Sequence, residues 1–543
     1  MTRKHTIDVL TATASDLRNL LDSGEVSSVE LGLVLNALIS TASADRVLEE
    51  ARMLDTERAQ KGPGSKLRGI PIILKRHSNF DSSHDACLIC ITRDLICIPN
   101  FGLEIPAGSL ALKGLNATED APIATLLREA GCIVIGKSNL SEWGNSKGFG
   151  VTSGWPAVGG QSRAETDFEL TQSPYMKGGV DPEDTWMGHS TPAGSSSGSA
   201  VATAAGFAPL TIGSEADGSI VQPAIRAGAY SLKGTVGDVI MKGTQSGGAA
   251  FDSAGPIGKS AEDCADVMDI LLPGGDFSSH LTKSWNGIRI AYLDYKTWQF
   301  PESVCEKTRA FDTQHELEML EALKKVESLG AQVTYHASLM SLPEITEKYK
   351  TVTMGEIGSK LRYSHPSNPG NPDIIDPIPR HQLAFVISRF LRLFNNPQLR
   401  TLQDLVTFNK EHAAEELPPD QPSQEVLENA LNDNMTDEEY HSGLAHLRQS
   451  VRHAVHLCLE ESNADVIMAS GETLLPSIAA CAGYPIGSVP LGFSIFNGRP
   501  FGMEIMSRNG EEEKIFQVIS AWEAMFPEAR QPPPLLVNWA TNL

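Results

Sequence analysis

The chain has 543 residues, of which 44 are lysine or arginine and 67 are aspartate or glutamate, which gives a formal net charge of −23. Nucleic acid is bound by clustered basic residues, so this balance argues against a nucleic-acid partner and indicates an acidic, solvated surface. Hydrophobic residues make up 41% of the chain, enough for a large core. No run approaches the roughly 18 apolar residues of a membrane-spanning helix, and the basic start lacks the apolar core of a signal peptide. We therefore expect a cytoplasmic protein without a membrane span.

The sequence holds eight cysteines, which a cytoplasmic protein keeps as reduced thiols. Three of them, Cys87, Cys90 and Cys97, crowd into one segment, but no histidine and no second C-x-x-C pair completes a zinc site with them. We predict neither a metal site nor a cofactor.

Helical spacing dominates residues 14–60, where Ser15 and Ser28 are placed to cap the first two helices. A short apolar strand is expected over residues 69–74. Residues 120–131 then read as a helix opened by a proline and closed by a glycine. A buried strand over residues 132–135 follows at once, and a helix followed by a strand is typical of α/β proteins.

Residues 340–460 are mostly helical and are interrupted by proline-rich stretches, so we interpret them as a helical elaboration of the sheet domain. The other elements expected in this half are helices over residues 261–272, 313–329 and 511–525, and strands over residues 288–293, 465–468, 485–490 and 501–506.

The most informative stretch lies between Gly188 and Ala224. It contains two serine–glycine clusters, Gly194-Ser-Ser-Ser-Gly198 and Asp217-Gly-Ser-Ile220, separated by an alanine-rich helix and a short strand. Small residues this dense allow two backbone turns to approach closely, with hydroxyls and N–H groups pointing into one space. The interspersed valine, leucine and isoleucine indicate a folded, buried segment rather than a linker.

This pattern resembles the signature of the amidase signature family, serine hydrolases that cleave amide bonds with a Ser-Ser-Lys triad. Ser195 falls on the family's bridging serine, whose preceding peptide is cis, and Ser219 falls on its nucleophile. The family's lysine ends an apolar strand that begins Gly-Ile-Pro, and here Gly69-Ile-Pro-Ile-Ile-Leu-Lys75 supplies Lys75. Further matches over residues 136–143 and 483–492 extend the resemblance over most of the chain.

The resemblance implies an α/β fold with a large, mixed and mostly parallel central sheet flanked by helices. It implies a single domain over residues 1–543, in which residues 14–60 form N-terminal helices and residues 340–460 the helical elaboration. We expect a monomer or a homodimer.

The family's mechanism answers the chemical demands of amide hydrolysis: a nucleophile, a proton donor to nitrogen and an oxyanion site. The resemblance makes Ser219 the nucleophile that forms an acyl-enzyme, Ser195 the proton relay and Lys75 the base. Lys75 is a base only when neutral, so burial has to move its pKa from about 10.4 towards about 7–8. The backbone N–H groups expected to form the oxyanion hole are those of Ala216, Asp217, Gly218 and Ser219.

The substrate class stays open, because the family spans small aliphatic amides, fatty acid amides, peptide C-terminal amides and glutamine used in tRNA amidation. Asp217 stands where many members have glycine, and this Asp-Gly-Ser variant resembles the branch that contains bacterial peptide amidase. We expect a small-molecule or peptide amide as the substrate.

Residues 76–104 depart from the family pattern. Members usually continue after the lysine with Asp-Asn and a compact loop to a turn that is here Ala107-Gly-Ser109, whereas this chain has Arg76-His77 and a longer, cysteine-rich insert. The insert is either a tolerated surface loop or a segment foreign to the native coding sequence, such as a retained intron. We favour the second, because the match breaks down immediately after a catalytic residue.

Two other functions compete with the Ser-Ser-Lys hydrolase. The altered lysine loop favours an amidase-fold protein with impaired catalysis and a binding or relic role. The cluster Gly194-Ser-Ser-Ser-Gly198 also fits the nucleophile elbow of Ser-His-Asp hydrolases, with His446, His453 or His456 as the histidine. An elbow follows a buried strand, however, and residues 181–193 do not have the pattern of one.

Overall fold

The computed structural model describes most of the chain. The described residues are 7–29, 44–75, 107–115, 117–148, 151–158, 160, 164–165, 170–171, 175, 181, 184–244, 250–302, 304–350, 377–534 and 536–537. The predicted insert at residues 76–104 and its three thiols lie outside them.

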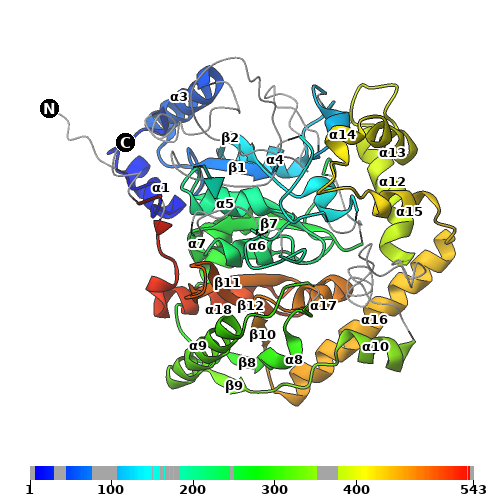
Figure 1. The fold of residues 1–543 in the computed structure, drawn as a ribbon. Helices are drawn as coiled ribbons and strands as arrows, with labels where there is room; N and C mark the ends of the chain where they lie inside the picture. Colours follow the sequence, from blue (N-terminus) through cyan, green and yellow to red (C-terminus); the bar gives the residue numbers. More distant parts are fainter. Residues whose placement is uncertain are drawn as a thin grey trace.

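A ten-stranded sheet runs through the described part of the molecule, in the order β2–β1–β5–β7–β6–β11–β12–β10–β8–β9 (Figure 1). A two-stranded ribbon of β3 and β4 stands apart from it. The strand bounds are β1 (Pro71–Lys75), β2 (Ile133–Ser138), β3 (Ala164–Glu165), β4 (Leu170–Thr171), β5 (Leu210–Glu215), β6 (Tyr230–Lys233), β7 (Ser253–Gly258), β8 (Arg289–Tyr292), β9 (Gln332–Thr334), β10 (Val466–Ser470), β11 (Ile486–Phe493) and β12 (Pro500–Met506).

The α/β class and the mixed sheet are confirmed, but the strands are not mostly parallel. Strands β2, β1 and β5 are parallel to one another at one end, and β10, β8 and β9 at the other. Every pairing between them, from β5 to β10, is antiparallel. The β11–β12 pair is a hairpin, and a hairpin joins antiparallel strands without a crossover helix.

Helices cover the sheet and complete its burial. The strands β1, β2, β5, β7, β10 and β12 are buried at every position, as expected for strands covered on both faces. The helix bounds are α1 (Ala14–Asp22), α3 (Ala44–Lys61), α4 (Pro122–Glu129), α5 (Ser197–Ala204), α6 (Val221–Arg226), α7 (Ala261–Leu271), α8 (Tyr295–Trp298), α9 (Arg309–Ser328), α10 (Leu342–Tyr349), α12 (Pro377–Leu391), α13 (Leu402–Glu411), α14 (Ala413–Glu416), α15 (Glu425–Leu431), α16 (Asp437–Glu461), α17 (Leu475–Ala482) and α18 (Glu512–Met525).

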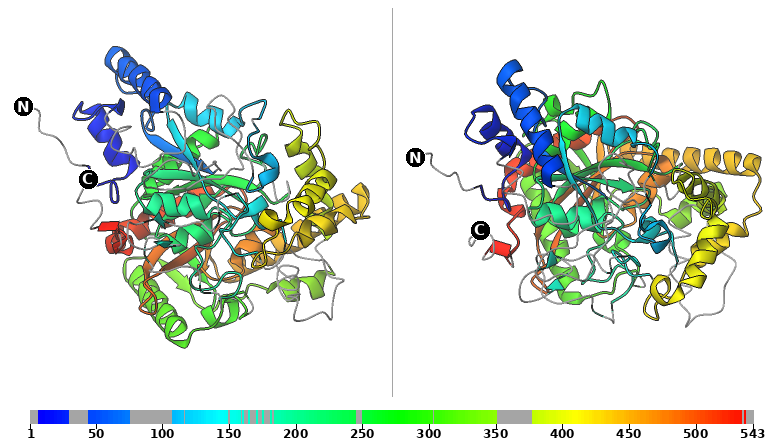
Figure 2. Two further views of the ribbon diagram at one scale, coloured as in Figure 1. Left: turned by 45° about the horizontal axis from the view of Figure 1, so that its top comes forward. Right: turned by 90° about the horizontal axis from the view of Figure 1, so that it is seen from above.

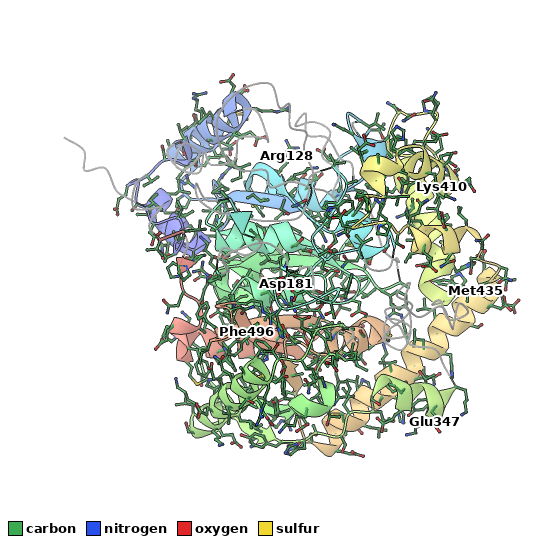
Figure 3. All side chains as sticks on the ribbon, viewed as in Figure 1. Arg128, Asp181, Glu347, Lys410, Met435 and Phe496 are labelled. Atoms are coloured by element: carbon green, nitrogen blue, oxygen red, sulfur yellow. The ribbon has the colours of Figure 1, made fainter. Side chains whose placement is uncertain are left out.

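Helices α10 and α12–α16 fall in the predicted helical elaboration. They gather on one side of the sheet and stay together in all views (Figures 1 and 2). Glu347, Lys410 and Met435 mark this side in the stick view (Figure 3). The treatment of residues 340–460 as part of one domain stays a prediction.

Helix α1 begins two residues earlier than a cap at Ser15 would allow. The cap is Thr13, whose hydroxyl accepts from the backbone N–H of Asp16 while the Asp16 carboxylate accepts from Thr13. This reciprocal pair is a capping box, and it outcompetes a serine two residues further along. Near it, the Arg530 guanidinium donates to the carbonyl of Leu10 at 2.8 Å, so the first helix and the last turns of the described chain lie side by side.

Among the described residues, none of the helices combines the length and apolar character needed to cross a lipid bilayer.

Candidate active site

Lys75 is the last residue of β1, between the parallel neighbours β2 and β5. Its side chain is fully buried, and four oxygens surround its Nζ atom. The Oγ atoms of Ser195 and Ser196 each lie 2.9 Å away, and the carbonyl and Oγ of Ser214 each lie 3.3 Å away. The lysine that the sequence singled out therefore contacts the serine-rich loop, although about 120 residues separate them.

Ser195 follows a cis peptide bond from Gly194, as the resemblance implied. Its carbonyl accepts from the backbone N–H of Ser141 at 3.1 Å. A β-carbon on Gly194 would lie 2.3 Å from the Oγ of Ser141, so a larger residue there would force the Ser141 side chain to move. The backbone N–H of Ser196 donates to the carbonyl of Ser219 at 3.0 Å, which joins the two serine loops directly.

Ser219 lies in the turn between β5 and α6 and is 7% exposed. Gly218 before it has a φ of +77°, a conformation that favours glycine. Ser477 donates from its hydroxyl to both oxygens of Asp217, at 2.9 and 2.8 Å. All four predicted oxyanion residues lie in this turn between β5 and α6, and their role as donors stays a prediction.

Two buried charged residues that sequence reasoning missed hold this turn. The Glu215 carboxylate accepts from the backbone N–H groups of Ile220 and Val221, at 2.6 and 3.0 Å. The Lys233 ammonium nitrogen donates to the carbonyl of Ala216 at 2.9 Å. Burial raises the pKa of Glu215 and lowers that of Lys233, so burial favours the neutral form of each.

A sequence signal for both residues exists in hindsight. Each is a charged residue at the end of a short apolar strand, as Lys75 is, and β5 leads straight into the Asp-Gly-Ser turn. Ser214 and Ser196, which complete the surroundings of Lys75, carry no such signal, because serines are common in turns.

The nucleophile-elbow alternative does not fit the geometry. Residues 184–193, which precede the serine cluster, form turns and irregular backbone instead of a strand. The three candidate histidines all lie on α16. His456 bonds the Tyr484 hydroxyl at 2.8 Å, and His446 bonds the carbonyl of Tyr349 at 2.7 Å, so these rings are engaged away from the serines.

A buried group of His189, Cys305 and Glu472 brings three potential metal ligands within 4.8 Å of one another. The Glu472 carboxylate, however, already pairs with Arg226 at 3.1 Å and with Arg499 at 2.6 Å. A cation placed there would meet two guanidinium charges in a low-dielectric interior. The group is better suited to an ion-pair network than to a metal.

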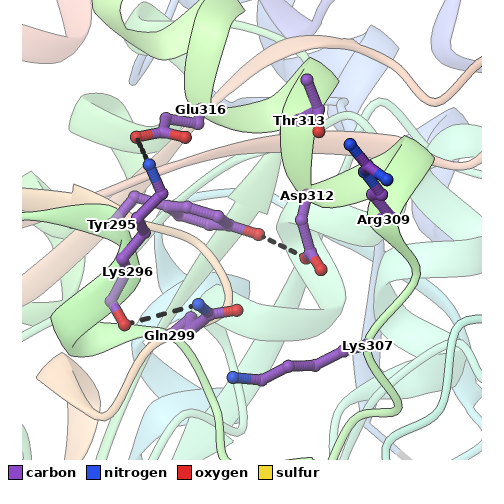
Figure 4. A pocket seen from close by; sticks show the side chains of 8 residues that line it. All are labelled: Tyr295, Lys296, Gln299, Lys307, Arg309, Asp312, Thr313 and Glu316. Atoms are coloured by element: carbon purple, nitrogen blue, oxygen red, sulfur yellow. Dashed lines mark hydrogen bonds and ion pairs between the residues drawn. The ribbon is translucent and has the colours of Figure 1, made fainter.

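A surface groove of about 510 Å³ lies between α8 and α9 (Figure 4). Two interactions cross it: Lys296 pairs with Glu316 at 2.8 Å, and the Tyr295 hydroxyl donates to Asp312 at 2.9 Å. None of the predicted catalytic residues lines this groove, so it is separate from the site around Lys75.

Comparison with known proteins agrees with this geometry. The family model described as Amidase matches residues 92–516, which is more than half of the chain. The chain belongs to the amidase family. Membership identifies an amide-hydrolysing enzyme and confirms the resemblance found in its sequence. The matched range begins after Lys75, so the catalytic role of this lysine stays a prediction from the sequence.

Those comparisons span nearly the full length of this amidase. It is 26% identical to a probable amidase of Arabidopsis thaliana, over 98% of this chain and 93% of that protein. It is also 26% identical to a putative amidase of Schizosaccharomyces pombe, over 96% of this chain and 86% of that one. The structure of native peptide amidase from Stenotrophomonas maltophilia superposes with a TM-score of 0.74 at 27% identity, covering 96% of this chain and 98% of its own.

Proposed function

We propose that this amidase hydrolyses its substrate with Ser219 as nucleophile, Ser195 as proton relay and Lys75 as base. The observation that carries the proposal is the 2.9 Å contact between the buried Lys75 Nζ and the Oγ of Ser195, in a loop hydrogen-bonded to Ser219. This arrangement supports the Ser-Ser-Lys mechanism over the alternative of impaired catalysis, because the base and the relay are already in hydrogen-bond contact.

The hydrogen bonds around Lys75 support its role as a base. The Ser196 hydroxyl donates to the Ser214 carbonyl at 3.2 Å, so its oxygen accepts from Lys75. A neutral amine that donates to Ser196 and Ser214 has its lone pair left for the hydroxyl of Ser195. Full burial favours this neutral form, because an ammonium group loses its hydration there.

The proton then follows the chain of hydroxyls. Ser195 gives its proton to Lys75 and takes one from Ser219, whose oxygen attacks the amide carbon. As the C–N bond breaks, Ser195 returns a proton to the leaving nitrogen, and water later hydrolyses the acyl-enzyme.

The anchored turn supports an oxyanion hole in the backbone before Ser219. In a trans peptide the C=O and N–H bonds point to opposite sides. Lys233 holds the Ala216 carbonyl, so the N–H of Asp217 in the same peptide unit points away from Lys233. Donors fixed in this way stabilise charge without reorganising during the reaction.

For the substrate we propose a peptide or small-molecule amide. The similarity to peptide amidase over almost the whole of both chains, together with the Asp217-Gly-Ser219 turn, makes a peptide C-terminal amide the first substrate to test. A cytoplasmic location and a monomeric or homodimeric state complete the proposal.

A fluorophosphonate label followed by peptide mapping tests the mechanism without knowledge of the substrate. We expect the label on Ser219. Ser219→Ala and Lys75→Ala should each reduce labelling and amide hydrolysis by at least about a thousandfold while keeping the fold. EDTA should have no effect, and the parent rate should rise with pH as the lysine loses its proton.

Ser199→Ala is the matched control. Ser199 is a buried serine of the same cluster that bonds Ser138 at 2.6 Å and the Ile212 carbonyl at 3.1 Å, so its loss should reduce stability but leave the label in place. A label on Ser196 would instead identify Ser196, the central serine of the nucleophile-elbow pattern, as the nucleophile. A folded wild-type protein that takes no label would favour the impaired-catalysis alternative.

A further inference from the structure

We infer that Arg226 is a positioning residue for the reaction: it fixes the loop that carries Ser195 to the helix that follows Ser219. The inference rests on the proposed Ser-Ser-Lys mechanism. Arg226 is the last residue of α6, a six-residue helix that begins two residues after Ser219. Its side chain is almost fully buried, with 4% exposed.

The guanidinium of Arg226 binds the segment that leads into Ser195. Its Nη1 atom donates to the carbonyl of Gly188 at 2.7 Å and to the carbonyl and hydroxyl of Thr191 at 3.0 and 2.9 Å. Its Nη2 atom donates to the carbonyl of Met187 at 2.8 Å. One side chain thereby satisfies three main-chain carbonyls within the eight residues before Ser195.

The other side of Arg226 is held by a buried ion-pair network. Its Nη2 atom pairs with Glu472 at 3.1 Å, and Glu472 pairs with the fully buried Arg499 at 2.6 Å. Burial by itself would raise the pKa of Glu472, but the two guanidiniums hold it well below its usual range, so the carboxylate stays charged. Arg499 also bonds Nδ1 of His189 at 3.2 Å, and Asn497 donates to the His189 carbonyl at 3.2 Å.

The two serine loops are therefore joined at two places. The backbone bond from Ser196 to Ser219 joins them at the reacting centre, and Arg226 joins them again at the far end of α6. Removing the guanidinium would take the donor from the buried carbonyls of Met187 and Thr191, whereas the Gly188 carbonyl keeps the Thr191 N–H at 3.1 Å, and the loop would shift to find new partners. A shift of about 1 Å at a reacting group costs on the order of a hundredfold in rate.

The position of Ser195 matters most when the leaving group needs a proton. An amide nitrogen has to be protonated as it leaves, whereas an alkoxide leaves an ester more readily. A displaced Ser195 should therefore slow amide hydrolysis more than ester hydrolysis of the same acyl group. A purely structural role for Arg226 would lower the fraction of active enzyme and affect both substrates equally.

The test compares Arg226→Met and Arg226→Lys with wild type on an N-acyl amino acid amide and its methyl ester, with rates expressed per active site titrated by fluorophosphonate. We expect Arg226→Met to reduce kcat for the amide by about a hundredfold with KM within about threefold, and kcat for the ester by less than about tenfold. Arg226→Lys should recover part of the amide rate, because it keeps the charge opposite Glu472 but loses the guanidinium fork.

Arg452→Met is the matched control. Arg452 also donates to a main-chain carbonyl, that of Ala482 at 2.7 Å, but it joins α16 to α17 away from the serines. Its loss should reduce stability and leave the ratio of kcat for the amide to kcat for the ester at the wild-type value. If Arg226→Met does not fold, Thr191→Val removes one of the acceptors of Arg226 with little change in volume and should lower the ratio a few-fold.

A wild-type amide-to-ester ratio of kcat in a folded Arg226→Met, or in Thr191→Val if Arg226→Met does not fold, would overturn the inference. Retained amide hydrolysis in Ser219→Ala would overturn the proposed mechanism instead, so the two failures are distinguishable.

Discussion

At the scale of single residues, the interior contains two buried histidines that pack against one phenylalanine. His189 and His315 each pack against Phe311 in a tilted arrangement, with ring centroids 4.6 and 4.7 Å from it, and the His315 ring lies 4.3 Å from that of Phe501. Burial lowers the pKa of His189 to about 4 and that of His315 to about 3. Both ring nitrogens of His315 lack a hydrogen-bond partner among the described residues.

His315→Phe should therefore stabilise the protein more in acid than at neutral pH. In the unfolded chain a histidine takes up a proton as the pH falls through about 6.5, whereas the folded His315 resists protonation down to about 3. The protonation of this histidine in the unfolded chain should lower the free energy of unfolding of wild type by about 2 kcal/mol between pH 7.5 and pH 5. The variant should not show this loss. Urea unfolding of wild type and His315→Phe at the two pH values measures the difference in free energy of unfolding. An equal stabilisation by His315→Phe at both pH values would contradict a lowered pKa for His315.

Sequence reasoning at this scale found the residues that a family pattern names and missed those that only the fold brings together. Lys75 and Ser195 were identified because each stands in a recognisable motif. Arg226 has no motif, and its contacts with residues 187–191 arise because α6 is short enough to return its last residue to the serine loop. Contacts of this kind depend on the path of the chain, which no local spacing encodes.

At the scale of elements, a buried lysine joins the helical side of the molecule to the loop after β2. Lys147 Nζ lies 2.8 Å from Glu142 and 2.7 Å from Glu416, the last residue of α14, and all three side chains are fully buried. Ser109 donates to Glu416 at 2.9 Å. Burial, and then the charge of Glu416, raises the pKa of Glu142 well above its ordinary value, so Glu142 is the carboxyl that stays protonated.

Lys147→Met should reduce the free energy of unfolding by about 3–5 kcal/mol, because it leaves buried carboxyl groups without their cation. Lys410→Met is the control: Lys410 pairs with Glu428 at 2.9 Å but is 61% exposed, so its loss should cost less than about 1 kcal/mol. Chemical denaturation of wild type and both variants measures the two losses in free energy of unfolding. Equal losses would mean that burial of the Lys147 group contributes nothing beyond a surface ion pair.

The sequence predicted most strands of the sheet but not their directions. The family resemblance implied a mostly parallel sheet, and parallel pairing holds at the two ends of the sheet. The central antiparallel pairing was missed, although Asn497-Gly498 between β11 and β12 is a hairpin signal. Directions in the centre depend on which strands become neighbours, and β6 pairs with β11 across more than 250 residues of sequence.

At the scale of the whole molecule, the described fold brings Lys75 next to the serine loop, and residues 76–104 lie outside the described part. The family match begins at residue 92, inside the predicted insert, while the strand that carries Lys75 ends just before it. The two explanations for the insert, a surface loop or foreign sequence, remain as predicted from the sequence.

If the insert is foreign, replacing it with a short loop that reads Asp-Asn after Lys75 and ends at Ala107-Gly-Ser109 should raise both soluble yield and activity per milligram. Fluorophosphonate labelling before and after the replacement measures the active fraction. Mass spectrometry of the protein from its native source is the independent check: peptides from His77 to Arg93 would establish the insert as genuine sequence.

The parallel pairing of β1 with β5 has a practical consequence. Side chains alternate between the two faces of a strand, so a slip of one residue in this five-residue strand would turn Lys75 to the opposite side of the sheet. Such a slipped sheet would keep its secondary-structure content and its circular dichroism spectrum. Covalent titration of the serine would therefore serve as a quality assay for recombinant batches, since it counts only molecules whose strands have paired in native alignment.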